Sequence, residues 1–393
     1  MAKYKTKKQL ILVPAKNNPR VLEQNETQTG IDELNKIHRS PINFDSKIGF
    51  KELTPTYGRH ISFIPISDLH YANARPEVLD VLDNYLKNTV TDIMHHGDML
   101  QVSVEGHHIG EVMESKLNTA EEQLLFADRI EKYAEKIVVA TGGNHDDPEF
   151  ASRLKNSYLS ALLPIYKQFG IKYYENACVV EYKVPVTQTE EASLWCVVMH
   201  CNGGTSTKKL MSAQKTYEQG MGVIAKFNQE HFGTDKSKYV VPDFILGGHF
   251  HANSSLDQSY ERNRYDKNGK VVGTYIQTIR VRSNSTLQNN NSTSFTRGFS
   301  NPVVPNLTQF DVHFVKNPFF EKSNFSKNPK YIPVVTEFPI FNRDFKLTKM
   351  AEKYMEMRKD KDFKEQIKEE HKNNTIKELL EYFEEKSMWG EKW

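Results

Sequence analysis

Cysteine is scarce in this sequence, with only three residues among 393. Cys178, Cys196 and Cys201 are unevenly spaced and form no C-x-x-C pair. Such a small, odd number argues against a disulfide framework and is typical of the reducing cytoplasm, where we expect the protein to be located. Cys201 follows His200, but no pattern of a general base accompanies it, so a buried thiol is favoured over a metal ligand or a nucleophile.

Long apolar runs are absent too. No stretch approaches the ~20 residues that a membrane-spanning helix needs, so no membrane association is expected. The lysines near the N-terminus are not followed by an apolar segment, and a secretory signal is therefore not expected.

The chain has little excess charge of either sign, because it contains 52 Lys and Arg residues and 50 Asp and Glu residues. The resulting net charge of +2 argues against a broadly basic nucleic-acid-binding surface, although a local groove is compatible with it. Hydrophobic residues make up 38% of the chain and charged residues 26%, which is typical of a globular protein with a sizeable core.

Five short apolar runs each lead into side chains of the kinds that bind metals. The runs are Ile61–Ile66, Asp92–His96, Ile137–Ala140, Leu194–Met199 and Phe244–Gly247. Runs of this length predict buried strands, and open α/β sheets bind ligands beyond the carboxyl ends of their strands. The residues that follow the runs are Asp68 and His70, Asp98, Asn144 and His145, His200, and His249 and His251.

The order of these blocks, D-x-H, G-D, G-N-H-D, H and G-H-x-H, resembles the calcineurin-like metallophosphoesterase superfamily. The resemblance covers about Ile61 to His251, and no ligand position within it is substituted. It implies an α/β fold in which two sheets form a sandwich flanked by helices. It also implies a phosphoric ester hydrolase that depends on two metal ions.

The resemblance further implies which residues hold each ion. The first metal would be bound by Asp68, His70, Asp98 and His251, and the second by Asp98, Asn144, His200 and His249. Asp98 would bridge the two ions, a position that requires a carboxylate. Two ions about 3.5–4 Å apart clamp a phosphate and lower the pKa of a bridging water, which supplies the hydroxide that attacks phosphorus. Mixed nitrogen and oxygen ligands suit Mn²⁺, Fe²⁺, Zn²⁺ and, with less preference, Mg²⁺; the resemblance favours manganese.

Two further residues of the G-N-H-D block are expected to serve catalysis. In the resembled family the histidine after the asparagine, here His145, is not a ligand but contacts the leaving group as a general acid or stabilises the transition state. An imidazole suits this task because it ionises near neutral pH. Asp146 is expected to orient His145, and Asp147 is interpreted as the cap of a helix that begins near Pro148.

Other histidines and two arginines belong to no block. His95 and His96 are interpreted as core or surface residues, whereas His107 and His108 lie in a polar loop that should overhang the metal site. Arg280 and Arg282 could line a phosphate-binding rim, but exposed strand arginines are the favoured interpretation.

Helices and further strands follow from periodicity and caps. Pro76 opens an amphipathic helix, and Thr119 with Glu122 predicts a capping box for another. After Gly170 the pattern indicates strands of a second sheet. The remaining expected elements are strands at 171–174, 177–186, 260–265, 270–282, 308–315 and 331–339, a hairpin turn at 266–269, and a helix at 211–230.

We predict an N-terminal extension at 1–57, a catalytic domain at 58–320, a connecting strand region at 321–343 and a charged helical tail at 344–393. The Ser- and Asn-rich stretch 283–306 is expected to be an exposed loop of the catalytic domain. The tail could bind a protein partner, form a homo-oligomer, or fold back onto the catalytic domain, and the sequence leaves these alternatives open.

Three functions are compatible with this pattern. A phosphodiesterase or nuclease acting on nucleic acid or a nucleotide is favoured, since Asp147-Pro148 resembles this block in the superfamily's double-strand-break repair nucleases. A phosphomonoesterase acting on a nucleotide or small phosphometabolite is the alternative.

Protein serine/threonine phosphatases continue their G-D block with D-R-G, whereas this chain has Met99-Leu100-Gln101. A non-catalytic interaction protein on the same fold should have lost ligands, and none is lost here.

Overall fold

The computed structural model divides the chain into two compact units, Met1–Lys47 and Ile48–Trp393. The residues that it describes are 13–15, 18–20, 48–55, 60–101, 117–146, 160–187, 189–201, 209–251, 253–265, 270–283, 286–287, 307–317 and 330–359. In the first unit, β1 (Val13–Ala15) and β2 (Asn18–Arg20) form a short antiparallel hairpin. Within the predicted N-terminal extension 1–57, the described residues are 13–15, 18–20 and 48–55.

The second unit is built on two mixed sheets of six strands each, which confirms the predicted two-sheet α/β sandwich. The first sheet has the order β14-β13-β4-β5-β6-β7, with strands β4 (Ile61–Ile66), β5 (Asp92–His96), β6 (Ile137–Thr141), β7 (Tyr173–Tyr174), β13 (Thr308–Lys316) and β14 (Tyr331–Pro339). The second has the order β11-β12-β10-β9-β8-β3, with strands β3 (Gly49–Leu53), β8 (Ala177–Pro185), β9 (Glu191–Met199), β10 (Phe244–Gly247), β11 (Ser254–Tyr265) and β12 (Val271–Ser283).

Side-chain alternation along β4 explains how the layers are held together. Ile61 and Phe63 lie in a core between the two sheets, whereas Ile64 and Ile66 lie in a second core under the helices. All six residues of β4 are buried, as expected for a strand covered on both faces. The helices of this outer layer are α2 (Pro76–Asn88), α4 (Thr119–Ile130), α6 (Leu163–Gln168) and α9 (Lys349–Lys359).

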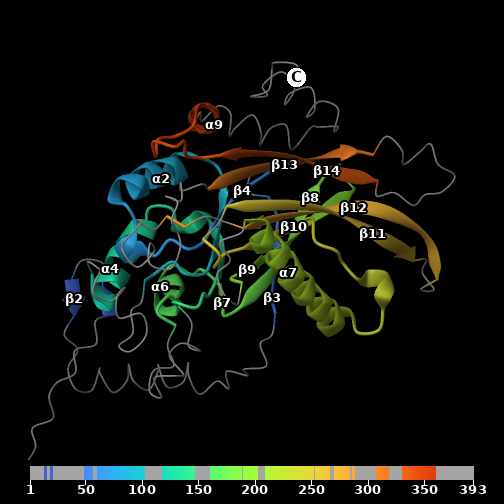
Figure 1. The fold of residues 1–393 in the computed structure, drawn as a ribbon, viewed down its shortest axis with the longest axis horizontal. Helices are drawn as coiled ribbons and strands as arrows, with labels where there is room; N and C mark the ends of the chain where they lie inside the picture. Colours follow the sequence, from blue (N-terminus) through green and yellow to red (C-terminus); the bar gives the residue numbers. More distant parts are fainter. Residues whose placement is uncertain are drawn as a thin grey trace, which may run out of the picture. The chain divides into compact units, whose positions relative to one another are not determined.

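A third core lies under α7 (Lys209–Phe232) on the outer face of the second sheet. Ile224 and Phe227 of α7 pack there against Ile245 of β10 and Val281 of β12. Figure 1 shows the two sheets between α7 and the group formed by α2, α4 and α6. The sandwich therefore has four layers: helices, first sheet, second sheet and helix.

The parallel strands β4, β5 and β6 are joined by crossover segments that place their carboxyl ends at one edge of the first sheet. Helix α2 begins with the expected proline at its first turn, and Val78, Leu79 and Leu82 face the core. In the second sheet, β9 and β10 are also parallel and in register from Cys196 and Phe244 onward. Both sheets thus bring the ends of parallel strands to the same edge of the sandwich.

Helix α4 begins one residue earlier than predicted, so the expected capping box of Thr119 and Glu122 is wrong. Asn118 is the N-cap, its side chain accepts from the Glu121 amide, and the Glu121 carboxylate accepts in turn from the Asn118 amide. Asparagine is as good a cap as threonine or better, and the same S/T/N-x-x-E spacing is satisfied one position back. The shift leaves Glu121 exposed and turns Glu122 into the interior.

One other expectation differs from the structure. β7 pairs with β6 of the first sheet, so the strand predicted at 171–174 does not belong to the second sheet. The long hairpin of β11 and β12 confirms the strands predicted on either side of 266–269, but that turn itself lies outside the described residues.

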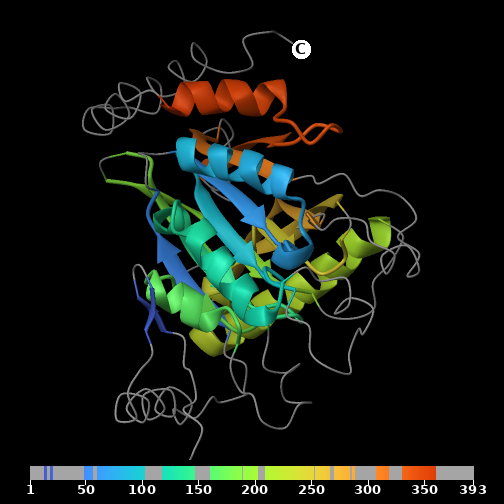
Figure 2. The same ribbon diagram turned by 90° about the vertical axis from the view of Figure 1, so that its left-hand side faces the viewer.

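The described strands extend beyond residues 58–320 on both sides. β3 pairs in parallel with β8, and β14 is the edge strand beside β13. Helix α9 packs on the catalytic unit through Ala351 and Tyr354, which are buried in the core under the helices. Figure 2 shows α9 lying beside α2. The rest of the predicted tail, 360–393, lies outside the described residues.

None of the described helices is long and apolar enough to cross a membrane.

Candidate dinuclear metal centre

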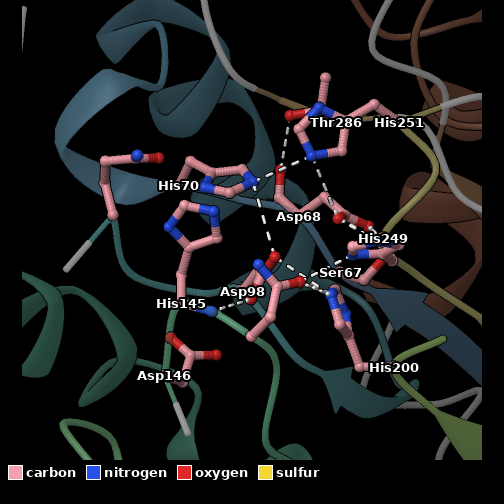
Figure 3. A network of polar contacts seen from close by, with 12 residues as sticks. Ser67, Asp68, His70, Asp98, His145, Asp146, His200, His249, His251 and Thr286 are labelled. Carbon is pink, nitrogen blue, oxygen red and sulfur yellow. Dashed lines mark hydrogen bonds and ion pairs between the residues drawn. The ribbon is translucent and has the colours of Figure 1, made fainter. Parts of the chain in front are cut away.

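The candidate ligands lie where five parallel strands end. Asp68 and His70 follow β4, Asp98 follows β5, and Asn144 follows β6 of the first sheet. His200 follows β9, and His249 and His251 follow β10 of the second sheet. Figure 3 shows the side chains of the two aspartates and four histidines converging on one small region, and Asn144 Oδ1 lies 2.9 Å from His200 Nε2. The structure thus brings together all seven residues that the sequence assigned to the metals.

Backbone conformation is unusual at the ligands. Among the described residues, six that are not glycine have positive φ, and five of them are Asp68, His70, Asp98, His249 and His251. Their φ values lie between 45° and 83°. Such conformations cost of order 1–3 kcal/mol each, and they persist only where surrounding contacts hold them, typically at functional sites. The turns after β4, β5 and β10 are therefore shaped to point ligands inward.

One group of donors consists of Asp68, His70 and His251, whose ligand atoms all lie within 4.8 Å of one another. The Nε2 atoms of His70 and His251 are 3.1 Å apart, and His251 Nε2 lies 3.4 Å from Asp68 Oδ1. Asp68 is completely buried, and His70 is nearly so. Two imidazole nitrogens and a carboxylate oxygen facing one point form a set that suits a transition-metal ion.

A second group consists of Asp98, His200 and His249. His200 Nε2 lies 3.1 Å from Asp98 Oδ2 and 2.9 Å from Asn144 Oδ1. The same Asn144 oxygen lies 2.7 Å from His249 Nδ1. The amide oxygen of Asn144 is therefore turned toward both histidines, where it is placed to act as a neutral ligand.

Asp98 lies between the two groups. Its Oδ2 is 3.1 Å from His200 Nε2 and 4.0 Å from His70 Nε2, while Oδ1 accepts a hydrogen bond of 2.8 Å from the His145 amide. One carboxylate therefore faces donors from both groups, which is the position that a bridging ligand occupies. A neutral amide at this position would lack the charge to be shared by two cations.

Hydrogen bonds fix the orientation of several ligands. His200 Nδ1 lies 3.2 Å from the carbonyl oxygen of His96, so an Nδ1 proton donated there leaves Nε2 free to bind a metal. Asp68 accepts from the Ser67 hydroxyl at 2.6 Å and from the His249 amide at 2.9 and 3.0 Å. The bonds from the His249 amide connect the β4 loop of the first sheet with the β10 loop of the second.

Two glycines in the motifs are required by close packing. Gly97 has a φ of +87°, and a Cβ atom there would lie 2.6 Å from the His200 ring. A Cβ atom on Gly143 would lie 2.2 Å from Asp98 Oδ1. Any side chain at either position would displace a ligand, which explains the glycines of the G-D and G-N-H-D blocks.

Electrostatics at the site favour a cation. Burial alone would raise the pKa of Asp98, but His200, His145 and His70 outweigh it and hold that pKa well below its usual range. The pKa of Asp68 is likewise lowered, because His251 and His200 outweigh burial and the charge of Asp98. Burial, assisted by His145 and His251, lowers the pKa of His70 to about 3, so this imidazole is neutral and able to coordinate. Two ionised carboxylates among imidazoles form a donor set that fits divalent metal ions.

His145 lies beside the first group of donors. Its ring contacts the ring of His70 edge-on, with centroids 4.8 Å apart and planes at 87°. In Figure 3 the His145 ring points toward His70, on the side of the site facing away from the Asp146 carboxylate. The imidazole is therefore close enough to the metal positions to contact a substrate bound there.

The Asp146 carboxylate binds backbone amides of the neighbouring loop. It accepts from Met99 N and Leu100 N, both at 3.2 Å. Burial, together with the charge of Asp98, raises the pKa of Asp146 well above its usual value, although the two backbone hydrogen bonds oppose this. These bonds connect the β6 loop, which carries Asn144 and His145, with the β5 loop, which carries Asp98.

Residues outside the motif blocks occupy structural positions. His95 is buried and lies 2.7 Å from the hydroxyl of Tyr166, while His96 contributes its carbonyl oxygen to His200. Cys201 is buried beside Thr216, and burial raises its pKa to about 12, in line with an inert thiol. His107, His108 and Asp147 lie outside the described residues.

The expectation of exposed arginines is wrong for Arg282, which is 8% exposed. Its guanidinium pairs with Glu337 of β14 and Asp257 of β11, so it connects the two sheets rather than lining the site. The guanidinium carbon of Arg280 lies 5.9 Å from the centre of the Phe244 ring. Both arginines belong to β12 and stabilise the sandwich.

Two residues that the sequence pattern did not indicate support the site. Thr286 and Leu287 were assigned to an exposed loop, but both are buried, and the Thr286 hydroxyl and the Leu287 amide donate to the Asp68 carbonyl at 2.7 and 3.2 Å. Leu287 also packs in the core under the helices, which explains why this part of the polar stretch is held in place. Leu287 itself, an apolar residue between Thr286 and Gln288, was the signal that the sequence offered for this segment. Residues 284–285 and 288–306 of that stretch lie outside the described residues.

Comparison with known proteins gives a family match and likenesses to solved structures. Residues 61–253 match the model of the calcineurin-like phosphoesterase family. Among solved structures, the calcineurin-like phosphoesterase YfkN from Bacillus subtilis is 12% identical over 79% of this chain and 99% of its own, with a TM-score of 0.31. Vacuolar protein sorting 29 from Cryptosporidium parvum is 13% identical over 71% of this chain and 98% of its own, with a TM-score of 0.29. No curated protein gave a significant match.

Proposed function

Residues 61–253 of this chain belong to the calcineurin-like phosphoesterase family, and from this premise we propose a metal-dependent phosphodiesterase that acts on nucleic acid or nucleotide phosphodiesters. The general activity, that of a metal-dependent phosphoric ester hydrolase, follows from the family. The substrate and the choice of diester over monoester are our proposal.

The observation that carries the proposal is the pair of donor groups that share Asp98. Asp68, His70 and His251 would hold one divalent ion, and Asn144, His200 and His249 would hold the other. Two ions held there would act as Lewis acids on the phosphoryl oxygens and would activate water for attack on phosphorus. We propose Mn²⁺ as the ion in use, with Fe²⁺, Zn²⁺ and Mg²⁺ as the alternatives that the same donors accept.

The protein's own residues would complete the reaction. Rigid loops from both sheets fix the donors, so that little reorganisation is needed when phosphate binds. His145, beside His70, would donate a proton or a hydrogen bond to the oxygen of the leaving group. Asp146 would act on this step by holding the β5 and β6 loops together through Met99 and Leu100.

A diester is favoured by the charges near the ligands. In the part of the chain that the structure describes, the ion pairs of Asp68 and Asp98 are all with histidines, and no lysine or arginine joins them. A phosphate monoester carries more negative charge than a diester at neutral pH, so it gains more from a neighbouring arginine. The D-R-G arginine of the protein phosphatases is absent from this sequence position as well.

We place the protein in the cytoplasm as part of this proposal, because its three cysteines are free and buried. A protein partner or a second copy of the chain binding to the helical tail also remains a proposal. Helix α9 itself packs on the catalytic unit.

The experiment that tests the activity compares bis-p-nitrophenyl phosphate with p-nitrophenyl phosphate. The metal-free protein is refilled with Mn²⁺, Fe²⁺, Zn²⁺ or Mg²⁺, and kcat/KM is measured for both substrates. We expect Mn²⁺ to restore turnover with a higher kcat/KM for the diester, and Asp98→Ala to lower turnover more than about 100-fold because the shared ligand is lost. Preference for the monoester would overturn the diester assignment, and no turnover of either substrate would overturn the activity.

A further inference from the structure

The loops that carry His70 and Asp98 run side by side after their strands end. Backbone hydrogen bonds connect Asp68 N with Gly97 O at 3.1 Å, His70 N with Asp98 O at 3.0 Å, and Tyr71 N with Met99 O at 3.0 Å. The two loops thus continue the pairing of β4 and β5 past the ends of the strands. This pairing places two ligands of the proposed metal centre next to each other.

Beyond these three bonds the two loops separate, and Glu122 of α4 lies between them. One atom, Glu122 Oε1, accepts from Ala72 N at 2.8 Å and from Gln101 N at 2.7 Å. Ala72 is two residues after His70, and Gln101 is three residues after Asp98. The carboxylate therefore joins the loops just after their direct pairing ends.

Glu122 is 2% exposed, and the two hydrogen bonds compensate for the burial of its carboxyl group. Burying a carboxyl group costs free energy. An apolar side chain would avoid this cost but could not accept the two hydrogen bonds. Asp146 accepts hydrogen bonds from the amides of Met99 and Leu100, and Glu122 accepts one from the amide of Gln101. The two carboxyl groups thus bind the three consecutive amides that follow Asp98. The β5 loop is therefore held from α4 on one side and from the β6 loop on the other.

His70 and Asp98 both have left-handed backbone conformations, with φ of 45° and 52°. Strained conformations of this kind need surrounding contacts to hold them, and the amides bound by Glu122 lie within the same two turns. We propose that Glu122 is a positioning residue of the metal centre, which sets the separation of His70 and Asp98 by binding the two loops with one oxygen atom. This inference rests on the proposed function, because it assigns a task toward the metals that His70 and Asp98 would hold.

The helix offers a matched control one residue away. Glu121 lies in the same first turn of α4 and is exposed, and its carboxylate caps the helix through the Asn118 amide. Replacing Glu121 weakens the helix end, by about 0.3–1 kcal/mol, without touching either ligand loop. If Glu122 served only helix stability, Glu121→Ala should therefore change Mn²⁺ binding as much as Glu122→Ala does.

The test measures Mn²⁺ binding by calorimetry, which does not depend on turnover. We expect Glu122→Ala to raise the Kd for Mn²⁺ by about 10–100-fold, the usual effect of removing a partner that orients ligands. Glu122→Gln should stay close to the wild-type Kd, since an amide oxygen can take the place of Oε1 and accept both bonds. Glu122→Asp keeps the charge but is shorter by one methylene, so it should bind Mn²⁺ as weakly as the alanine variant. Glu121→Ala should lower the Tm and leave the Kd unchanged.

Equal Mn²⁺ affinity in the wild type and in Glu122→Asp would overturn the inference while leaving the proposed function intact. Glu122→Asp also carries the test if Glu122→Ala fails to fold. Weak binding by Glu122→Gln, equal to that of the alanine variant, would overturn the assignment of the hydrogen bonds as the cause. Absence of Mn²⁺ binding by the wild type would overturn both the inference and the proposed function.

Discussion

At the scale of single residues, the proposed function gives different roles to the Asp98 carboxylate and to the His145 imidazole. Asp98 faces donors from both sheets and shares its second oxygen with the His145 amide. The His145 ring lies edge-on against His70, and one of its nitrogens lies within 4.8 Å of donor atoms of His70 and Asp98. Loss of each side chain should therefore have a different consequence.

We predict that His145→Ala keeps its metal and loses turnover. Its imidazole would act on the leaving group, and removal of a general acid typically lowers kcat by about 10²–10⁴-fold. Asp98→Ala, in contrast, should lose both metal content and turnover because this carboxylate faces donors of both groups. Elemental analysis of the purified variants, together with kcat for the favoured substrate, distinguishes the two cases.

His231→Ala serves as the control, since this histidine lies at the end of α7 and stacks on Phe227. It should retain both metal and turnover. If His145→Ala lost metal to the same extent as Asp98→Ala, His145 would be a ligand and its assignment to the leaving group would be wrong.

At the scale of elements, the sequence predicted most strands and the helices α2 and α7, because apolar runs and helical periodicity depend on burial alone. β4 and β6 are buried on nearly every residue, and their sequences are almost uninterrupted runs of apolar residues. The five ligand-bearing loops were found because each follows such a run. Their convergence from two different sheets came from the resemblance to a family, since periodicity does not say which strand ends meet.

What the sequence did not predict depends on contacts between distant segments. The N-cap of α4 was assigned one residue late because Asn118 and Thr119 are both acceptable caps, and only packing chooses between them. With Asn118 as the N-cap, Glu121 takes the capping position and Glu122 points inward. The contacts of Glu122 with Ala72 and Gln101 therefore could not be predicted. The burial of Thr286 and Leu287 depends on Asp68, more than two hundred residues earlier.

The inward-facing Glu122 should also make the stability of the protein depend on pH. Burial raises the pKa of Glu122 from 4.5 to about 7, against the effect of its two backbone hydrogen bonds. As pH rises from 4.5 to 7, the unfolded chain releases this proton while the folded protein keeps it. The unfolded state then binds fewer protons, so the free energy of unfolding falls over this window, by about 3 kcal/mol for this group.

Glu122→Gln removes this linkage because it carries no ionisable group. We predict that the free energy of unfolding of the variant exceeds that of the wild type by a margin that grows from pH 5 to pH 8. Urea unfolding of both proteins at several pH values measures the margin, and the other ionisable groups cancel in the difference. A margin independent of pH would show that the Glu122 carboxyl group ionises alike in the folded and unfolded protein.

At the scale of the whole catalytic unit, the proposed metal centre joins the two sheets. Asp68, His70, Asp98 and Asn144 come from loops of the first sheet, and His200, His249 and His251 come from loops of the second. Direct contacts across this edge include the bonds of the His249 amide to Asp68 and the approach of His200 to Asp98. Divalent ions bound there would strengthen the same connection with several metal–ligand bonds, so metal binding and folding should be coupled.

We therefore predict that Mn²⁺ raises the Tm of the full-length protein. A ligand at 100 times its Kd stabilises the folded state by about 2.7 kcal/mol for one site, which corresponds to a Tm shift of roughly 4 °C for a unit of this size. Thermal unfolding followed by circular dichroism with increasing Mn²⁺, and with a chelator, measures the shift. Asp98→Ala should show no dependence on Mn²⁺, whereas His145→Ala should melt like the wild type at each concentration. If the Tm of the wild type were the same with Mn²⁺ and with chelator, the loops of the two sheets would not be joined by metal, and the donor groups around Asp98 would have a structural role alone.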